Sequence, residues 1–470
     1  MIRFLNAYFP KRTLVLGVSE ACLVAIAFLI ATVVRVGVSD ANVLFHYEQG
    51  FLKIFVVSVT LITCMHYFDL YDSSVVSNRR EVATRLVQVF GTACIVLACL
   101  YYFYPPLELG RGIFLGGFVL AAIVLILWRR AFLVYNSQLQ LAARTMVLGA
   151  GPLAVPVMHE LQSRPELGLR LVSHVLAVGN RQLNCGGEET TSARPGTLTC
   201  DEFEDDIKTH RVNRVIVTMD DRRGTLPVEL LLSLKSRGLV VQDGADFYEA
   251  VTGKVPIESL RLSWLLFSPG FHVSRFLVIY KRLASILVSI VGLLLSLPFF
   301  PFIALAIKLT SSGPLFYMQR RVGRDDTIFY CYKFRTMRAD AEADSGATWA
   351  ADNDPRITPV GKFIRKARLD EIPQLWNVLK GEMCLIGPRP ERPEFVDWLA
   401  TEIPFYRLRN TIRPGITGWA QIRYEYGNSV EDAKEKLRYD LFYIKNMSLG
   451  LDLLVFLQTI KIILLGRGAK

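Results

Sequence analysis

An adjacent acid pair, Asp370 and Glu371, carries the strongest chemical signal in the sequence. Basic residues lie close to it on both sides: Lys366, Arg368, Arg389 and Arg392. Carboxylates and phosphate oxygens bind the same hard metal ions, and the arginine fork matches phosphoryl oxygens. The segment therefore predicts chemistry on a phosphorylated substrate.

Helix signals surround the acid pair. Pro373 can open a helix at its first position and Gly381 can close it. The two carboxylates would then lie just before a helix N-terminus, where the macrodipole favours anions. An isolated acidic pair at such a place is usually only a helix cap. The surrounding cations favour a functional site instead.

Residues 366–393, KARLDEIPQLWNVLKGEMCLIGPRPERP, resemble the signature of the polyprenyl-phosphate hexose-1-phosphate transferases, bacterial enzymes that start surface-polysaccharide chains. The similarity extends upstream through KRLASILVSIVGLLLSLPFF, GPLFYMQRRVG and YKFRTM, and downstream through RPGITGWAQ and KLRYDLFYIKN. It covers residues 275–470. The segments TGKVPIESL and LSWLLFSPGF further resemble the long members of the family.

This resemblance implies a reaction and a role for each site residue. Asp370 would attack the β-phosphate of a UDP-sugar, with glucose the commonest sugar of long relatives, and Glu371 would bind Mg²⁺. UMP would leave, and undecaprenyl phosphate would take up the sugar phosphate. Residues matching substrate-binding positions are Lys333, Arg335, Arg365, Arg389, Arg413 and Thr417. Any one of the lysine and arginine residues in this set would alone be typical of an exposed charge, but together they favour a phosphate pocket.

Composition places part of the chain in a membrane. The 470 residues are 51% hydrophobic, with a mean hydropathy of +0.32. Apolar runs at 14–34, 51–70, 86–104 and 112–134 are each about long enough to span a bilayer, giving a predicted transmembrane region 1–135. Basic residues gather at one side of these runs, which predicts an inner-membrane protein with the later domains in the cytoplasm. They are Lys11, Arg12, Arg79, Arg80, Arg85, Arg129 and Arg130. The net charge of +11 suits anionic headgroups and phosphorylated substrates better than nucleic acid.

A fifth apolar run, Leu283–Ile307, has basic residues at both ends and prolines, Pro298 and Pro301, in its middle. Charge on both sides disfavours a crossing, and proline removes backbone donors and bends a helix. The sequence therefore predicts a re-entrant helix at about 281–308 that enters and leaves the same leaflet. Ser296 is the nearest hydroxyl able to satisfy a carbonyl freed at the break.

Residues 144–250 alternate short apolar strands with helical stretches, which predicts a Rossmann-like α/β domain. The segment GAGPLA at 149–154 matches a dinucleotide fingerprint, but no acidic residue stands at 178–181, where that fingerprint needs one. A regulatory or dimerising spacer is the alternative. A linker at 251–274 would lead to the catalytic domain at 275–470, and the apolar stretch 451–466 is either an interfacial helix or packed within that domain.

The predicted fold is thus a multidomain membrane protein: a four-helix transmembrane bundle, a Rossmann-like α/β domain and a monotopic phosphoglycosyl transferase domain with a re-entrant helix. The six histidines and eight cysteines show no metal-ligand spacing. A membrane-bound NAD-dependent epimerase is disfavoured because Tyr439–Tyr443 lacks the required Tyr-x-x-x-Lys pattern. A membrane-bound nucleotide-sensing or assembly protein without transferase activity stays open. The family also implies a homodimer.

Overall fold

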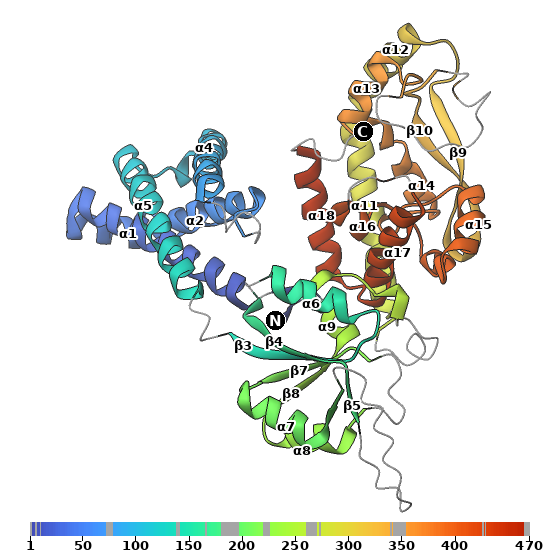
Figure 1. The fold of residues 1–470 in the computed structure, drawn as a ribbon. Coiled ribbons are helices and arrows are strands. Elements are labelled where there is room, and N and C mark those ends of the chain that lie inside the picture. Colours follow the sequence, from blue (N-terminus) through green and yellow to red (C-terminus); the bar gives the residue numbers. More distant parts are fainter. Residues whose placement is uncertain are drawn as a thin grey trace, which may run out of the picture. The chain divides into compact units, whose positions relative to one another are not determined.

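A computed structural model describes most of the chain (Figure 1). The residues outside the description are 1, 5–6, 10, 72–78, 138–141, 165–166, 180–196, 220–225, 260–269, 272–273, 339–340, 342–353, 425–426, 428 and 465–470. Contacts divide the chain into two compact units. Phe9–Ala150 and Ala154–Gln242 make up nearly all of the first, and Asp243–Lys470 makes up most of the second. Two short strands, β1 (Ile2–Phe4) and β2 (Ala7–Phe9), pair near the N-terminus.

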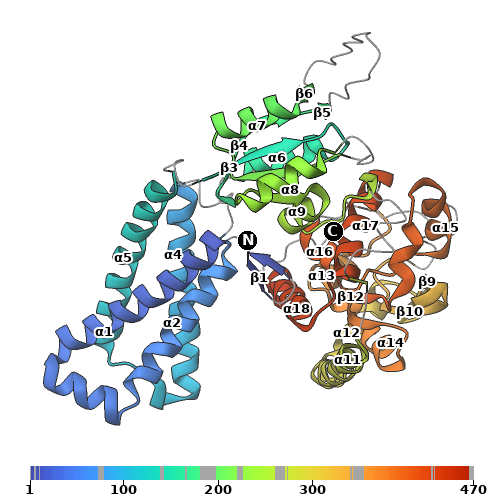
Figure 2. The same ribbon diagram turned by 90° about the horizontal axis from the view of Figure 1, so that it is seen from below.

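Apolar helices that run alongside one another form the first part of the first unit (Figure 2). They are α1 (Lys11–Tyr47), α2 (Gly50–Tyr67), α4 (Arg79–Phe103) and α5 (Arg111–Ser137), with a short turn η1 (Pro105–Leu107). They cover the four predicted apolar runs, although α1 extends to Tyr47 with a break at Gly37. Their facing sides bury Phe28, Leu61 and Leu125. Within the described chain, five helices are long and apolar enough to cross a membrane, these four and Arg275–Thr310.

A buried ion pair joins the two ends of this helical region in sequence. Arg129 on α5 donates through Nε to Glu20 Oε1 on α1 at 2.6 Å and through Nη2 to Glu20 Oε2 at 3.1 Å. Its Nη1 donates to the carbonyl of Leu70 at 3.0 Å. Arg129 is one of the basic residues from which the membrane orientation was predicted. Its side chain is instead enclosed between helices.

A four-stranded sheet, ordered β4-β3-β7-β8, forms the rest of the first unit, and β3 runs parallel to both β4 and β7. Its strands are β3 (Ala143–Leu148), β4 (Leu169–Val175), β7 (Arg214–Val217) and β8 (Val240–Asp243), and β5 (Ala177–Gly179) pairs separately with β6 (Thr197–Thr199). In Figure 1, α6 (Ala154–Ser163) lies on one face of the sheet and α7 (Cys200–Thr209) and α8 (Val228–Ser236) lie on the other. This alternation of parallel strands and helices agrees with the predicted Rossmann-like fold.

The first glycine of the GAGPLA segment has a packing role. Gly149 has φ +120°, and a Cβ there would lie 2.6 Å from the backbone nitrogen of Met219. Its carbonyl oxygen is 2.9 Å from His174 Nε2 and accepts a hydrogen bond from Thr218 Oγ1 at 3.2 Å. Tight strand packing therefore accounts for this glycine without a bound nucleotide.

The second unit consists of helices and two small two-stranded sheets. Its strands pair β9 (Phe316–Val322) with β10 (Ile328–Phe334), antiparallel, and β11 (Cys384–Ile386) with β12 (Gly415–Thr417), parallel. Its longer helices are α9 (Gly244–Thr252), α11 (Arg275–Ser296), α12 (Phe300–Thr310), α13 (Pro359–Lys366), α14 (Gln374–Lys380), α15 (Pro393–Glu402), α16 (Trp419–Arg423), α17 (Val430–Lys445) and α18 (Leu449–Leu464). Short 3₁₀ turns are η4 (Ile257–Ser259), η5 (Leu297–Phe299), η6 (Arg324–Asp326), η7 (Leu369–Glu371) and η8 (Tyr406–Thr411).

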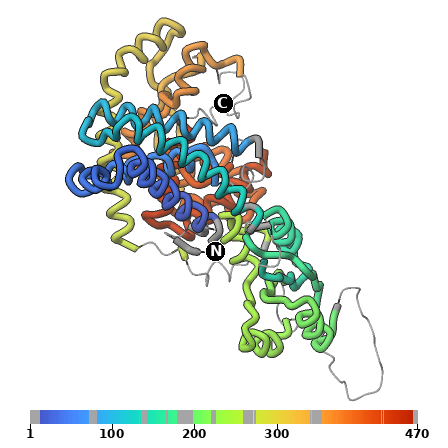
Figure 3. Tube along the Cα trace, turned by 90° about the vertical axis from the view of Figure 1, so that its left-hand side faces the viewer, coloured from blue at the N-terminus to red at the C-terminus, as the bar shows by residue number. Residues whose placement is uncertain are grey.

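The fifth apolar run is a broken helix. The chain bends between α11 and α12, which are the yellow segments of Figures 1 and 3. A 3₁₀ turn with Pro298 separates the two segments, as the prolines predicted. Ser296 Oγ donates to the carbonyl of Leu293 at 2.9 Å, not to that of Leu294, whose usual helical donor is missing at Pro298.

Both segments of the broken helix pack on the same unit. On α11, Arg282 donates to the carbonyl of Leu379 at 2.8 Å, at the end of α14. On α12, Ile303 and Ile307 form a buried cluster with Phe334 and Ile364. The two ends of this long apolar segment are therefore held by one folded domain.

Helix α9 lies with the second unit although it follows the Rossmann-like strands in sequence. Glu249 on α9 is buried, accepting from Lys445 Nζ at 2.6 Å and from Asn446 Nδ2 at 2.8 Å. Trp419 Nε1 donates to the carbonyl of Gly253 at 2.9 Å. These contacts join the predicted linker region to the catalytic domain, and the division between units falls at Asp243.

Helix α18 packs within its domain, which is one of the two predicted possibilities for the C-terminal stretch. Leu451 and Val455 are fully buried in the core of the unit. Leu453 and Leu457, on another side of the helix, are 54% and 52% exposed. One face therefore packs within the domain while another carries exposed apolar residues, and contact of that face with a bilayer surface stays a prediction.

Candidate active site

A left-handed residue and a 3₁₀ turn place the acid pair. Helix α13 ends at Lys366, and Arg368 adopts φ 57°, which turns the chain without a glycine. Asp370 and Glu371 occupy the 3₁₀ turn η7, directly before α14. Pro373 caps α14 and Gly381 ends it at φ 91°, close to the positions predicted from sequence.

Glu371 is bound by cations from three segments. Its Oε1 accepts from Arg389 Nη2 at 2.7 Å and lies 3.3 Å from Lys333 Nζ on β10. Its Oε2 lies 3.9 Å from Arg368 Nη1. Burial disfavours the charged carboxylate, but Arg389, Lys333 and Arg368 outweigh burial and hold the pKa of Glu371 well below its usual range. Glu371 therefore stays ionised.

Asp370 has a contrasting environment. It is 8% exposed, and it accepts no hydrogen bond from any residue that the structure describes. Burial and the adjacent Glu371 charge raise the pKa of Asp370, and Lys333, Arg365 and Arg389 only partly offset them. A buried carboxylate without hydrogen-bond partners keeps its lone pairs available for attack on an electrophile.

Backbone contacts with the segment that contains Thr417 and Gly418 hold the loop that carries Arg389. Gly387 N donates to the carbonyl of Thr417 at 2.9 Å, extending the β11–β12 pairing. A Cβ on Gly418 would lie 2.2 Å from the carbonyl oxygen of Gly387, so the approach needs glycine. Arg389 Nη1 also donates to Gln421 Oε1 on α16 at 3.2 Å.

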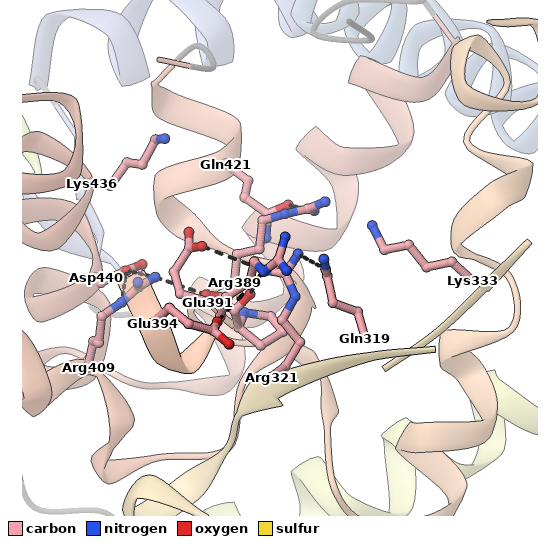
Figure 4. Close-up of polar contacts among 12 residues, drawn as sticks. Gln319, Arg321, Lys333, Arg389, Glu391, Glu394, Arg409, Gln421, Lys436 and Asp440 are labelled. Carbon is pink, nitrogen blue, oxygen red and sulfur yellow. Dashed lines mark hydrogen bonds and ion pairs between the residues drawn. The ribbon is translucent and has the colours of Figure 1, made fainter. Parts of the chain in front are cut away.

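Three consecutive carbonyls of this loop accept hydrogen bonds from outside it. Arg409 donates to the carbonyl of Arg389 at 3.0 Å, Arg321 to that of Pro390 at 2.8 Å, and Val322 N to that of Glu391 at 2.9 Å. Figure 4 shows Arg409 on one side of the loop and Arg321 on the other. The Arg389 guanidinium is thus aimed at Glu371 by a rigid frame.

Arg409 is itself fixed by a buried ion pair. Its Nη2 lies 2.9 Å from Asp440 Oδ2 on α17 (Figure 4). Its Nη1 donates to Tyr406 Oη at 2.8 Å. Both members of the pair are less than a tenth exposed. This pair links α17 to the loop that carries Arg389.

The structure brings together only some of the predicted substrate-binding residues. Lys333 and Arg389 contact Glu371, and Arg365 is close enough to affect the pKa of Asp370 while its Nε donates to Thr336 Oγ1 at 2.9 Å. Thr417 Oγ1 instead forms a hydrogen bond with Thr459 at 2.7 Å. In the described residues, the Arg413 side chain makes no hydrogen bond or ion pair with the acid pair.

Arg335 also lies apart from Glu371. Its Nη2 donates to the carbonyl oxygen and hydroxyl of Ser311 at 2.8 and 3.0 Å. Three side-chain nitrogens, Gln374 Nε2 close to the acid pair in sequence and Nε and Nη1 of Arg335, are buried without a partner among the described residues.

Sequence reasoning missed two residues that organise the site, Arg409 and Gln421. Arg368 was among the cations noted beside the acid pair, and the structure places its Nη1 3.9 Å from Glu371 Oε2. Arg409 and Gln421 reach the site only through tertiary packing. Their separation from Arg389, 20 and 32 residues, carries no periodic signal.

The residues present fit a magnesium ion that is shared with a substrate. The described residues contain no group of three or more His, Cys, Asp or Glu side chains able to hold a metal. Mg²⁺ commonly takes one or two protein carboxylates and completes its shell with phosphate oxygens and water. Glu371 and Asp370 supply such a pair.

Comparisons with known proteins point to one family. Residues 276–466 match the bacterial sugar transferase family, and residues 66–226 match a CoA-binding domain. A UDP-N-acetylgalactosamine-undecaprenyl-phosphate N-acetylgalactosaminephosphotransferase from Aeromonas hydrophila is 46% identical over 47% of this chain and 52% of its own length.

Two UDP-glucose:undecaprenyl-phosphate glucose-1-phosphate transferases align more widely. The protein from Xanthomonas campestris pv. campestris is 30% identical over 67% of this chain and 65% of its own length. The one from Escherichia coli (strain K12) is 31% identical over 80% of each chain. The chain belongs to the bacterial sugar transferase family, and it combines the transferase domain with apolar N-terminal helices and a Rossmann-like, CoA-binding type of domain.

Proposed function

We propose that the protein transfers a hexose-1-phosphate from a UDP-sugar to undecaprenyl phosphate at the cytoplasmic face of the inner membrane. The observation that carries this proposal is Asp370, a buried carboxylate without a hydrogen-bond partner among the described residues, next to a Glu371 held by three cations. One carboxylate is thus available to react and the other is fixed.

Asp370 acts as the nucleophile. A carboxylate oxygen attacks the β-phosphorus of the UDP-sugar, the new O–P bond forms, and the bond to the α-phosphate oxygen breaks with its electron pair leaving on UMP. An oxygen of undecaprenyl phosphate then attacks the same phosphorus. The Asp370–phosphorus bond breaks, which regenerates the carboxylate and gives undecaprenyl-pyrophosphate-sugar.

The cations make this attack between anions feasible. Arg389 and Lys333 lie within 3.3 Å of Glu371, where they can also bind phosphoryl oxygens of the donor, and Arg365 lies close to Asp370. Mg²⁺, held by Glu371 with substrate phosphates, would neutralise the pyrophosphate and stabilise the departing UMP. Arginine's planar fork favours such phosphoryl contacts.

We also propose that α11 and α12 form a re-entrant helix. The segment Arg275–Thr310 has 36 residues, so a straight helix would be about 54 Å long, well beyond a hydrocarbon core of about 30 Å. Because Arg282 and Ile307 both contact the same folded domain, entry and exit through one leaflet accommodates the bend. This arrangement would keep the acid pair at headgroup level.

The identity of the sugar is a narrower question. Glucose was predicted from the long relatives, and two proteins named for glucose align across most of this chain. However, 225 residues of the chain align at 46% identity with a protein named for N-acetylgalactosamine. UDP-glucose and UDP-N-acetylgalactosamine are therefore the first donors to compare. A homodimer remains a prediction from the family.

Release of UMP tests the reaction. Detergent-purified protein with Mg²⁺ and undecaprenyl phosphate should release UMP from one of a panel of UDP-hexoses, and Asp370→Asn should abolish release. Asp397→Asn, which changes an exposed carboxylate of α15, is the matched control and should retain full activity. No release from any UDP-sugar would contradict the proposal and favour the sensing or assembly protein.

A further inference from the structure

Arg335 is a buried cation whose donors are only partly used. It follows β10, and its side chain is anchored by Nη2 to Ser311 at 2.8 and 3.0 Å. The residue is 5% exposed, and its Nε and Nη1 are buried without a hydrogen-bond partner in the described part of the chain. In the same part of the chain, no carboxylate lies within ion-pair distance of it.

An enclosed guanidinium without an anion is unfavourable, because buried charges and buried donors both lose their hydration. The fold nevertheless fixes Arg335 in this position. Two unpaired N–H donors on a fixed cation form a site for an anion, and a phosphate is the anion that arginine binds most readily in such chemistry.

The surroundings of Arg335 include a surface suited to a lipid chain. Its anchor, Ser311, directly follows α12, and three apolar side chains of α12 are exposed: Phe302 at 72%, Leu305 at 59% and Leu309 at 77%. Their spacing of three and four residues places them along one side of the helix. The apolar stripe therefore ends close to the residue that holds the guanidinium.

The two cations of the YKFRTM segment have different partners. Lys333 lies 3.3 Å from Glu371, whereas Arg335 is anchored at the end of α12. Between them, Phe334 is buried against Ile303 and Ile307 of α12. One short segment thus presents one cation to the acid pair and another beside the apolar helix.

We propose that Arg335 binds the phosphate of the polyprenyl acceptor, with the isoprenoid chain along Phe302, Leu305 and Leu309. This inference rests on the proposed function and assigns Arg335 to the second half of the reaction alone. Lys333, Arg365 and Arg389 then serve the donor.

Separate measurement of the two half-reactions tests this assignment. UMP released from the UDP-sugar in a single burst, without acceptor, reports attack by Asp370; steady-state transfer with varied undecaprenyl phosphate reports the second step. For Arg335→Met we expect an unchanged burst and an acceptor KM raised at least about tenfold, the size typical of losing a charged hydrogen bond. Arg335→Lys should show a smaller rise in the same direction.

A nearby arginine provides the control. Arg338→Met removes the same charge three residues away from an exposed side chain whose Nη2 donates to the carbonyl of Pro355, and it should leave the acceptor KM unchanged. A reduced UMP burst in Arg335→Met would place Arg335 in the donor site and overturn the inference. An unchanged acceptor KM would overturn it as well.

Two further variants cover the case in which Arg335→Met does not fold. Ser311→Ala removes one anchor of the guanidinium and should raise the acceptor KM a few-fold with the burst intact. Leu309→Asn should weaken undecaprenyl phosphate more than a short-chain prenyl phosphate. Equal effects on both chain lengths, or none in Ser311→Ala, would contradict the proposed path. Absence of UMP release from the unaltered protein would instead reject the proposed function itself.

Discussion

Buried charged side chains in two regions of this chain differ in how many of their polar atoms have hydrogen-bond or ion-pair partners. In the helical bundle, both carboxylate oxygens of Glu20 and all three nitrogens of the Arg129 guanidinium have partners within the protein. In the transferase domain, Asp370 accepts no hydrogen bond from the described residues, and Arg335 has two unpaired donors. Complete pairing is typical of charges that hold helices together, whereas incomplete pairing of enclosed charges indicates a place for a ligand.

The largest expected effect comes from removing the fixed charge of the transferase site. Glu371→Gln would leave Lys333, Arg389 and Arg368 without their shared anion and would remove the proposed magnesium ligand. We expect kcat to fall about 10³-fold, or about 4 kcal/mol. Glu382→Gln, a change at a carboxylate that contacts Asn377 instead, should cost far less; equal losses would remove the special status of Glu371.

Breaking the ion pair of the helical bundle should lower the stability of the protein and leave the reaction rate unchanged. Arg129→Met leaves Glu20 buried without its partner, which is expected to destabilise the protein by about 3 kcal/mol. The loss should appear as a lower Tm in detergent, while UMP release per folded molecule stays unchanged. Arg130→Met alters an exposed neighbour and should leave Tm unchanged. If Arg129→Met had the same Tm as the unaltered protein, the fully paired Arg129 and Glu20 would have no structural role.

The Arg409–Asp440 pair lies between these two extremes, because it is completely buried and yet touches the loop that carries Arg389. Arg409→Met should lower both Tm and kcat. The double variant Arg409→Met/Asp440→Leu removes the unpaired acid and should recover much of the Tm, since replacing a whole buried pair is often neutral.

The double variant separates the contribution of Arg409 to stability from its contribution to positioning Arg389. The hydrogen bond to the carbonyl of Arg389 is still missing, so kcat should remain lowered about tenfold, while KM for the UDP-sugar changes less. If recovery of Tm also restored kcat, Arg409 would have only a structural role.

Sequence reasoning succeeded where neighbouring residues determine the structure. Pro373 and Gly381 indicated α14, and Pro298 indicated the break after α11, because proline and glycine act through their own backbone geometry. The acid pair was found from its own types and spacing. Contacts between distant segments were not accessible in this way. Arg129 was interpreted as a charge at a membrane face, because nothing near it in sequence shows that Glu20 lies opposite.

The smallest expected effect is a displacement of the pH profile, and it separates the two carboxylates of the acid pair. Because the pKa of Asp370 is raised and that of Glu371 is lowered, Asp370 is the group that becomes protonated first as the pH falls. Protonated Asp370 cannot attack, so single-burst UMP release should rise with pH through the raised pKa of Asp370. In Glu371→Gln the neighbouring negative charge is absent, and the residual activity should have its acidic limb at lower pH. Asp397→Asn should leave the limb in place. An acidic limb that does not move in Glu371→Gln would mean that another group controls it, and Asp370 would then not be the carboxylate that titrates during attack.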